Sequence, residues 1–167
     1  MSVEHENPFR LRPAAPGDAD GCARVHHTSW VETYSGLLPA AHWETDTLAR
    51  RKQRWRRSLA GGADVTVAEA GGEIIGFAMA GAARRIGEHD PVRERELFSL
   101  YLLAAHHGGG AGRALLEAVL PAGAPAQLWV AEENPRARRF YQRSGFLPDG
   151  ARFRDEGLDL AEVRLVR

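Results

Sequence analysis

Apolar residues come in short runs along this chain, and seven of these runs predict β-strands because glycine, proline or polar residues bound them. The predicted strands are Phe9–Arg12, Val65–Glu69, Ile74–Ala80, Glu96–Leu103, Gln127–Ala131, Phe146–Pro148 and Ala161–Val166. Helical spacing, together with start and stop residues, predicts four helices. The helices run from a cap at Asp18 through Val25 to about Tyr34, over about Ala41–Leu59, over Ala111–Leu120, and from Asn134 to Gly145.

The order of these elements predicts an α/β fold: a strand, two helices, three strands, a helix, a strand, a helix and two strands. We expect one mixed central sheet of six to seven strands flanked by about four helices. Within it, the segment from Glu96 to Ala131 is predicted to form a parallel crossover unit. The length of 167 residues suits one domain. We assign residues 9–167 to that domain and residues 1–8 to an N-terminal tail.

Charge is balanced, with 22 basic and 22 acidic residues, so no net field draws the protein to nucleic acid or to an anionic membrane. No apolar run approaches the roughly 18 residues of a membrane-spanning helix, and the N-terminus lacks a secretory signal pattern. We therefore expect a cytoplasmic protein without nucleic-acid or membrane partners. The single Cys22 cannot form an internal disulfide, and no cysteine or histidine spacing predicts a metal site.

The most informative segment is Leu97–Leu116, where an apolar strand leads through a glycine-rich loop directly into a helix. Four of the five residues from position 108 to 112 are glycine, so few side chains separate the backbone from a ligand. The first turn of the following helix presents unpaired N–H groups and the positive end of its dipole. This arrangement predicts a phosphate site, and a pyrophosphate is its natural occupant.

Two motifs in this half of the chain carry a family resemblance. The loop reads His107-Gly108-Gly109-Gly110-Ala111-Gly112, and downstream come Asn134 and the segment Phe140-Tyr141-Gln142-Arg143-Ser144-Gly145-Phe146. Together they resemble the GNAT N-acetyltransferase superfamily, whose acyl-CoA loop has the form Gln/Arg-x-x-Gly-x-Gly/Ala and whose later helix ends in Tyr-x-x-x-Gly-Phe after an asparagine. His107 departs from the glutamine or arginine of the family. We therefore expect weaker cofactor binding or a histidine contact, with the site itself retained.

The resemblance implies a GNAT fold, acetyl-CoA as co-substrate, and a role for each matching residue. Backbone groups of Leu102 and Leu103 would hold the acetyl carbonyl and the pantetheine arm, with Asn134 on the pantetheine side. Tyr141 would contact the cofactor and protonate the departing CoA thiolate, and Glu96 would be the general base. The pyrophosphate would be held by His107, Gly108, Gly109, Gly110, Ala111, Gly112 and Arg113.

These residue types suit acyl transfer to an amine. An alkyl amine with a pKa of about 10.4 is mostly protonated at neutral pH, and a carboxylate can take its proton directly or through water. The neutral amine then attacks the thioester while backbone N–H groups stabilise the oxyanion. Each role has a structural alternative, because Tyr141 can pack beside Phe140, and Glu96 belongs to an alternating charged run at a strand entrance. Glu132 and Glu133 are second choices for the base.

The acceptor side carries weaker signals. We interpret Trp30 and Tyr34 as acceptor-pocket residues, with a place in the core as the alternative. The run from Arg50 to Arg57 is interpreted as a solvated helix face, with an acidic substrate or nucleic acid as the alternative. The segment Ser29–Pro39 also resembles a pattern of uncharacterised bacterial members of the family. We expect a small-molecule or exposed peptide amine as acceptor, and a homodimer is a family-level expectation.

Two other functions stay open. A dinucleotide-binding oxidoreductase would use Gly110-x-Gly112 with Glu132 about twenty residues on, but Leu115 stands where close helix packing needs a small residue. A non-catalytic acyl-CoA sensor would use the same fold, but the chain retains both Tyr141 and Glu96. The sequence therefore predicts an N-acetyltransferase that transfers the acetyl group directly in a ternary complex.

Overall fold

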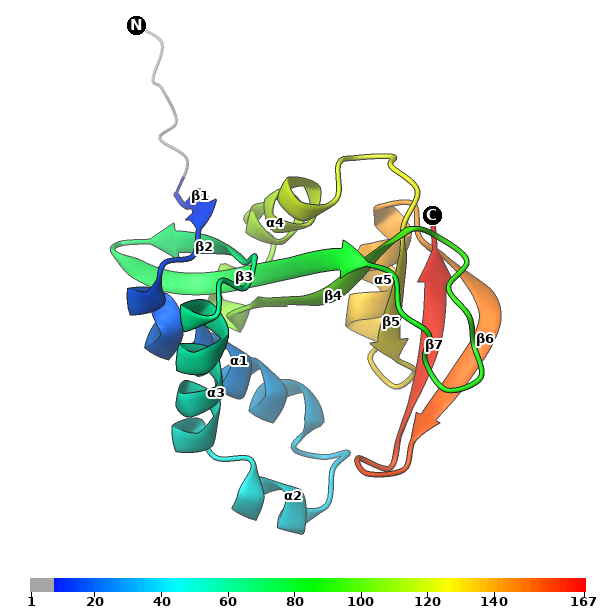
Figure 1. Ribbon diagram of the computed structural model, residues 1–167, viewed down its shortest axis with the longest axis horizontal. Helices are drawn as coiled ribbons and strands as arrows, with labels where there is room; N and C mark the ends of the chain where they lie inside the picture. Colours follow the sequence, from blue (N-terminus) through cyan, green and yellow to red (C-terminus); the bar gives the residue numbers. More distant parts are fainter. Residues whose placement is uncertain (1–7) are drawn as a thin grey trace, which may run out of the picture.

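A seven-stranded sheet forms the centre of the protein, with strand order β1-β2-β3-β4-β5-β7-β6 (Figure 1). The computed structural model describes residues 8–167, so most of the predicted tail, residues 1–8, lies outside the described residues. The strands are β1 (Arg10–Pro13), β2 (Thr66–Ala70), β3 (Glu73–Ala82), β4 (Arg95–Leu102), β5 (Gln127–Ala131), β6 (Leu147–Asp155) and β7 (Leu160–Val166). The helices are α1 (Ala19–Tyr34), α2 (Ala40–Thr45), α3 (Leu48–Ala60), α4 (Ala111–Val119) and α5 (Pro135–Arg143), with 3-10 turns η1 (Pro16–Asp18) and η2 (Ala104–His106). The predicted mixed α/β fold is confirmed.

The parallel pair of β4 and β5 is the part of the sheet that positions the site. The other neighbouring strands are antiparallel, whereas β4 and β5 run parallel and are connected through α4, as the sequence predicted. The two strands pair only at Glu96 with Gln127 and at Leu97 with Leu128. Beyond this point β4 continues beside β3 to Leu102 without partners in β5. The edge of β4 that faces β5 is therefore unpaired over its second half.

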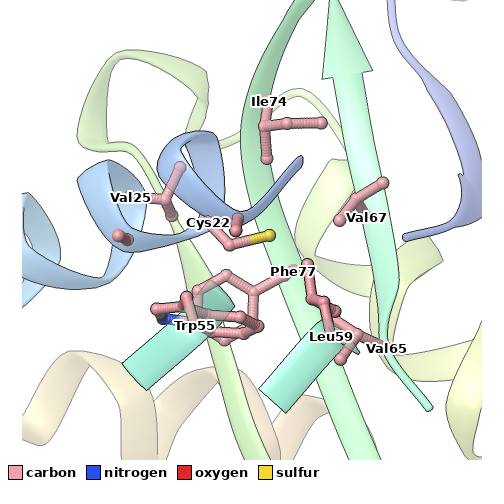
Figure 2. Packing of buried hydrophobic residues seen from close by; sticks show 10 residues of the cluster. Cys22, Val25, Trp55, Leu59, Val65, Val67, Ile74 and Phe77 are labelled. Atoms are coloured by element: carbon pink, nitrogen blue, oxygen red, sulfur yellow. The ribbon is translucent and has the colours of Figure 1, made fainter. Parts of the chain in front are cut away.

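Helices cover both faces of the sheet (Figure 1). On one face, Phe77 of β3 lies in a buried cluster with Cys22 of α1 and Trp55 of α3 (Figure 2). Ala78, the next residue of β3, belongs to the cluster on the opposite face with Leu115 of α4. This alternation is what a strand covered on both faces requires. Within residues 8–167, no helix combines the length and the apolar character needed to cross a membrane.

The second predicted helix differs from the prediction. The segment Ala41–Leu59 forms two helices, α2 and α3, so the described residues contain five helices rather than about four. Asp46 leaves helical geometry, with φ −90° and ψ 70°. The Thr47 side chain then accepts a hydrogen bond from the Arg50 N–H at 3.3 Å and begins α3. The break was missed because neither glycine nor proline marks it.

The strand predicted at Phe146–Pro148 is longer, since β6 spans Leu147–Asp155 and replaces much of the expected polar connection. β6 is the last strand of the sheet and most of its residues are exposed, so it carries no apolar run. Its backbone bonds to β7 decide the strand, with a register shift between Pro148 and Arg152.

Gly76 allows β3 to lie close to the end of β4, on the edge opposite the unpaired one. A Cβ at this position would lie 2.8 Å from the Tyr101 carbonyl oxygen and 2.9 Å from the Leu102 side chain. Because the nearest atom belongs to the backbone, Gly76→Ala is expected to lower the free energy of unfolding by about 1 to 3 kcal/mol, which urea unfolding followed by circular dichroism measures. Gly36→Ala is the control, since a Cβ there meets nothing within 4 Å. Equal stability of the two variants would contradict the proposed close approach.

Candidate active site

The opening between β4 and β5 continues as a cleft of about 1070 Å³. Its wall is built from the end of β4, the glycine loop, α4, α5 and the last turns of α1. The structure thus brings together most of the residues assigned to the cofactor from the sequence. The predicted site residues that line the cleft are Tyr34, Leu102, His107, Gly108, Gly110, Gly112, Arg113, Asn134 and Tyr141.

Glycine is required at two positions of the loop. Gly108 and Gly110 have φ values of +81° and +88°, which L side chains rarely adopt. The first backbone bond of α4 runs from the Ala114 N–H to the Gly110 carbonyl at 3.0 Å. The N–H groups of residues 111–113 therefore have no acceptor within the helix. A Cβ on either glycine would meet nothing within 4 Å, so the loop just before these donors borders open space.

His107 folds back onto the end of β4. Its Nε2 lies 2.9 Å from the Leu102 carbonyl oxygen, so this nitrogen carries the proton and donates. Burial lowers the pKa of His107, the bond to Leu102 opposes this shift, and the nearby Arg136 guanidinium adds to it. The ring is neutral at pH 7, and the positive charge at this end of the loop comes from Arg136, which contacts the ring and lines the cleft. Sequence analysis missed Arg136 because it lies 29 residues away on another helix.

Three predicted cofactor residues, Leu103, Gly109 and Ala111, do not line the cleft. The Leu103 N–H donates to the Ile75 carbonyl at 2.9 Å, so it is not available to an acetyl carbonyl. The Ala111 side chain is buried in the cluster under α4, so only its backbone is placed to meet a ligand. Leu102, in contrast, lines the cleft at the end of the unpaired edge of β4, where its carbonyl accepts the hydrogen bond from His107.

The turn between β5 and α5 carries Asn134 and the two second-choice bases. The Asn134 side-chain oxygen accepts a hydrogen bond from the Ala137 N–H at 3.1 Å, which begins α5 as predicted. Its side-chain NH2 group lies near the Tyr34 hydroxyl, and this contact opposes the rise that burial causes in the pKa of Tyr34. Glu133 lines the cleft, whereas Glu132 is an exposed residue of an ion pair with Arg152 at 2.9 Å.

Two buried tyrosines line the cleft from different helices, Tyr141 from α5 and Tyr34 from α1, and each is 8% exposed. The Tyr141 ring packs against Phe140 and Phe146 with centroid distances of 5.2 and 6.2 Å. Tyr141 is therefore both a core residue and a cleft residue, so the two interpretations of its pattern are compatible. Burial, and then the neighbouring tyrosines, raise the pKa of Tyr141 above its usual range. The hydroxyl keeps its proton at neutral pH, as a general acid must.

Glu96 lies at the paired end of β4 and does not line the cleft. Its carboxylate is 1% exposed and accepts hydrogen bonds from the Arg84 backbone N–H at 3.0 Å and from the Arg84 guanidinium at 3.1 Å. The strand-entrance position that suggested a solvated residue is thus buried, because β3 and β5 flank it on both sides. Contact between Glu96 and a group in the cleft would require water between them.

Glu162 of β7 is a carboxylate that the sequence analysis did not single out. Burial raises the pKa of Glu162, Asp155 and Glu96 raise it further, and Arg84 opposes the shift. Its position two residues after the buried Leu160 was the available signal, because residues i and i+2 of a strand share a face. In the part of the chain that the structure describes, no three histidine, cysteine or acidic side chains are grouped to hold a metal ion.

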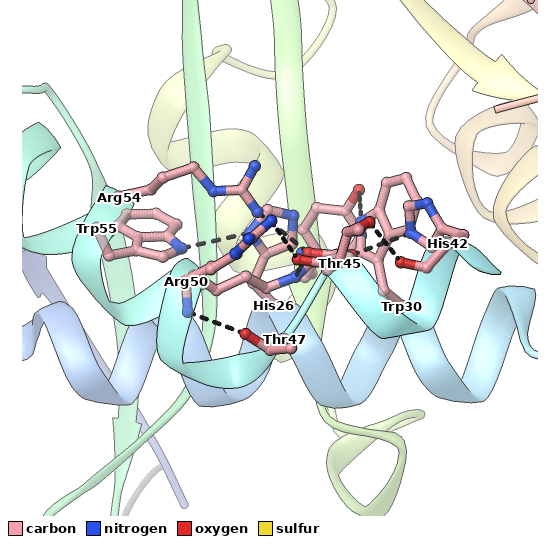
Figure 3. Close-up of polar contacts among 11 residues, drawn as sticks. His26, Trp30, His42, Thr45, Thr47, Arg50, Arg54 and Trp55 are labelled. Carbon is pink, nitrogen blue, oxygen red and sulfur yellow. Dashed lines mark hydrogen bonds and ion pairs between the residues drawn. The ribbon is translucent and has the colours of Figure 1, made fainter. Parts of the chain in front are cut away.

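Trp30 lines a different cavity, of about 770 Å³, bordered by α1, α2 and α3 (Figure 3). Its Nε1 donates to the Tyr101 hydroxyl at 3.0 Å, and Tyr101 lines the cleft. The two residues therefore stand between the cleft and the second cavity. Trp30 and Tyr34, both assigned to the acceptor side, lie on α1 but line different cavities.

Comparison with known proteins agrees with this geometry. The sequence matches the Acetyltransferase (GNAT) family over residues 24–146, a range that contains the glycine loop and Tyr141. The chain belongs to this family. The uncharacterized N-acetyltransferase YuaI of Bacillus subtilis is 34% identical, over 93% of this chain and 87% of the relative. The probable N-acetyltransferase Rv2775 of Mycobacterium tuberculosis is 31% identical, over 87% of this chain and 83% of the relative.

Solved structures with coenzyme A show the same fold. The PaiA N-acetyltransferase of Thermoplasma acidophilum, in complex with coenzyme A, has a TM-score of 0.62 at 21% identity and covers 98% of each chain. YncA of Salmonella typhimurium, solved with acetyl-CoA, has a TM-score of 0.65 at 20% identity and covers 95% of this chain and 92% of that one. The protein is therefore a GNAT acyltransferase, and the oxidoreductase alternative is set aside.

Proposed function

We propose that this GNAT protein moves an acetyl group from acetyl-CoA to a primary amine of a small molecule or an exposed peptide, by direct transfer in a ternary complex. The observation that carries the proposal is the cleft at the opening of β4 and β5. There the unpaired N–H groups of the glycine loop and the Tyr141 side chain border the same space. An anion held by the loop would place the rest of a long ligand beside that tyrosine.

The chain's own groups fit coenzyme A along this cleft. The loop N–H groups of residues 111–113 would hold the pyrophosphate, with Arg136 adding positive charge. The pantetheine arm would lie between the unpaired edge of β4 and Asn134. Acetyl-CoA, when bound, supplies the thioester whose carbonyl carbon an amine attacks. Backbone N–H groups on the unpaired edge of β4 are proposed to stabilise the oxyanion.

Two side chains are proposed to move protons. As the C–N bond forms and the C–S bond breaks, the departing sulfur takes the proton of the Tyr141 hydroxyl, whose raised pKa keeps it protonated until then. The proton of the amine passes through water to the carboxylate of Glu96, because that carboxylate lines neither cavity. Arg84 holds Glu96 in place through the two hydrogen bonds described above.

The proposal is tested with acetyl-CoA and a panel of primary amines. Calorimetry is expected to show binding of acetyl-CoA, and thiol release is expected with at least one amine class, with the acetylated product identified by mass spectrometry. Absence of acetyl-CoA binding would overturn the proposal. Binding without turnover on any acceptor would favour the non-catalytic sensor instead.

Tyr141→Phe is expected to slow turnover by roughly 100-fold or more, because the variant cannot protonate the leaving sulfur. The KM for acetyl-CoA should stay within about twofold, since the ring remains in place. Steady-state thiol release measures both constants. Tyr34→Phe is the comparison, because Tyr34 also lines the cleft and also has a raised pKa. If Tyr34→Phe shows the larger loss, the acid is Tyr34 and the assignment of Tyr141 is wrong.

Glu96→Gln is expected to reduce the rate most at low pH, where neutral amine is scarcest and the base is needed most. The pH–rate profile of kcat/KM measures this. Arg84→Gln is the comparison for positioning, because it removes the guanidinium hydrogen bond and leaves both the carboxylate and its bond to the Arg84 backbone N–H. Identical profiles for Glu96→Gln and the parent protein would remove Glu96 from the mechanism. If Glu162→Gln instead changes the pH–rate profile at low pH, the general base is Glu162.

A further inference from the structure

The cavity of about 770 Å³ beside α3 has no role in the proton transfers or in cofactor binding proposed above. It is bordered by α1, α2 and α3, with Met79 of β3 and Leu158 from the turn between β6 and β7. Trp30 and Tyr101 separate it from the cleft. A molecule in this cavity would thus lie one aromatic layer from the cleft.

The inner wall of the cavity is aromatic, and the buried Arg51 lies over the Trp30 ring at 5.0 Å from its centroid. Trp30, Trp55 and His26 line it, and Figure 3 shows their side chains gathered on this side of the sheet. The His26 Nδ1 accepts a hydrogen bond from the Trp55 Nε1 at 3.3 Å. Burial, with Arg51 acting in the same direction, lowers the pKa of His26 to about 3, so the ring is neutral near pH 7.

The outer wall of the cavity is strongly positive. Four arginines line it, namely Arg50, Arg51, Arg54 and Arg57, against one carboxylate, Asp46. One row along α3 consists of Arg50, Arg54 and Arg57, because residues three and four positions apart share a helix face. With four arginines and one aspartate, the lining residues carry three more positive than negative formal charges.

Asp46 pairs with only one arginine of this row, Arg54, because its oxygens are also occupied by Arg51. They accept from Arg51 at 2.9 Å and from Arg54 at 3.1 Å, and His42 lies 3.1 Å away. Burial by itself would raise the pKa of Asp46, but Arg51 outweighs that effect and keeps the carboxylate ionised. The Asp46 group therefore anchors the outer wall and leaves the other arginines uncompensated.

Arg50 and Arg57 are the uncompensated members of the row. Within residues 8–167, neither has a carboxylate partner, and the Arg50 guanidinium donates only to the Thr45 backbone carbonyl at 3.2 Å. On the opposite face of α3, Arg56 pairs with Asp20 at 2.8 Å. Arg50, Arg54 and Arg57 are exposed, as expected for a solvated helix face, and they also border the cavity.

We infer that the cavity binds an anionic group of the acceptor, so that the acceptor is an amine that also carries a carboxylate or a phosphate. Guanidinium groups bind both anions with two parallel hydrogen bonds, and the aromatic wall would cover the apolar part of the same molecule. The anion lies against Arg50 and Arg57 while the amine reaches past Trp30 toward the cleft. This inference rests on the proposed function, because it names the acceptor class of that reaction.

The acceptor class is tested with matched sets of amines. Aminoalkyl carboxylates, aminoalkyl phosphates and the corresponding aminoalkyl amides, each with two to six methylene groups, are compared by thiol release. The anionic acceptors are expected to have kcat/KM values at least about tenfold above the amides of equal length. The better of the two anionic sets identifies the group, and equal values for charged and neutral acceptors would overturn the inference.

Paired variants locate the anion. Arg50→Gln combined with Arg57→Gln is expected to raise KM for the preferred anionic acceptor by about 10- to 100-fold, with kcat and the neutral amides within about twofold. Lys52→Gln combined with Arg56→Gln removes the same charge near Asp20, on the other face of α3, and should leave all constants within about twofold. Equal effects of the two pairs would mean a general charge effect and would refute the site.

A binding measurement separates this inference from the proposed function. Trp30 and Trp55 line the cavity, so titration with inorganic phosphate or succinate is expected to change tryptophan fluorescence in the parent protein. The change should be lost in the Arg50→Gln and Arg57→Gln pair and kept in the control pair. If this holds while no amine is acetylated, the anion site stands and the proposed function fails. If neither anion binds while an amine is acetylated with acetyl-CoA, the proposed function stands and the anion site is refuted.

Discussion

Hydrogen bonding between β4 and β5 stops after two residue pairs, and the rest of the site depends on that early end. Buried backbone N–H and C=O groups must be paired, so the free edge of β4, apart from the Leu102 carbonyl that accepts from His107, needs either water or a ligand beside it. The glycine loop follows directly at the end of the same strand, and its unpaired helix N–H groups face the same opening. The cleft is thus bordered by two sets of backbone N–H groups, one on the unpaired edge of β4 and one at the start of α4.

Helix α1 links the two cavities because its residues face both. Tyr34 borders the cleft, Trp30 borders the second cavity, and the bond from Trp30 to Tyr101 ties the helix to β4 at 3.0 Å. The arrangement keeps an aromatic layer between the proposed cofactor cleft and the proposed acceptor cavity. The proposed acid Tyr141 lies on the cleft side of that layer, since it lines the cleft together with Tyr101.

Sequence analysis was most successful where a function depends on neighbouring residues. The glycine loop, Asn134 and Tyr141 were placed in one cleft because a strand, a tight loop and a helix start are local features. Sequence analysis was less successful for residues whose environment depends on burial by distant elements. Glu96 looked like a solvated residue of a charged run, yet flanking strands bury it beside Arg84. For Glu162, the only signal of burial was its position two residues after Leu160 in a strand.

The sequence by itself determined the fold class, the order of the elements and the glycine loop before α4, because these follow from spacing and from backbone conformations that particular residues allow. Only the tertiary structure decided which distant side chains share a space. Arg136 lies against His107 because α5 packs beside the loop, and Arg50 and Arg57 face a cavity because Asp46 breaks the predicted helix and turns α3. Such neighbours result from packing between elements that lie far apart in the sequence, and no local pattern along a chain encodes that packing.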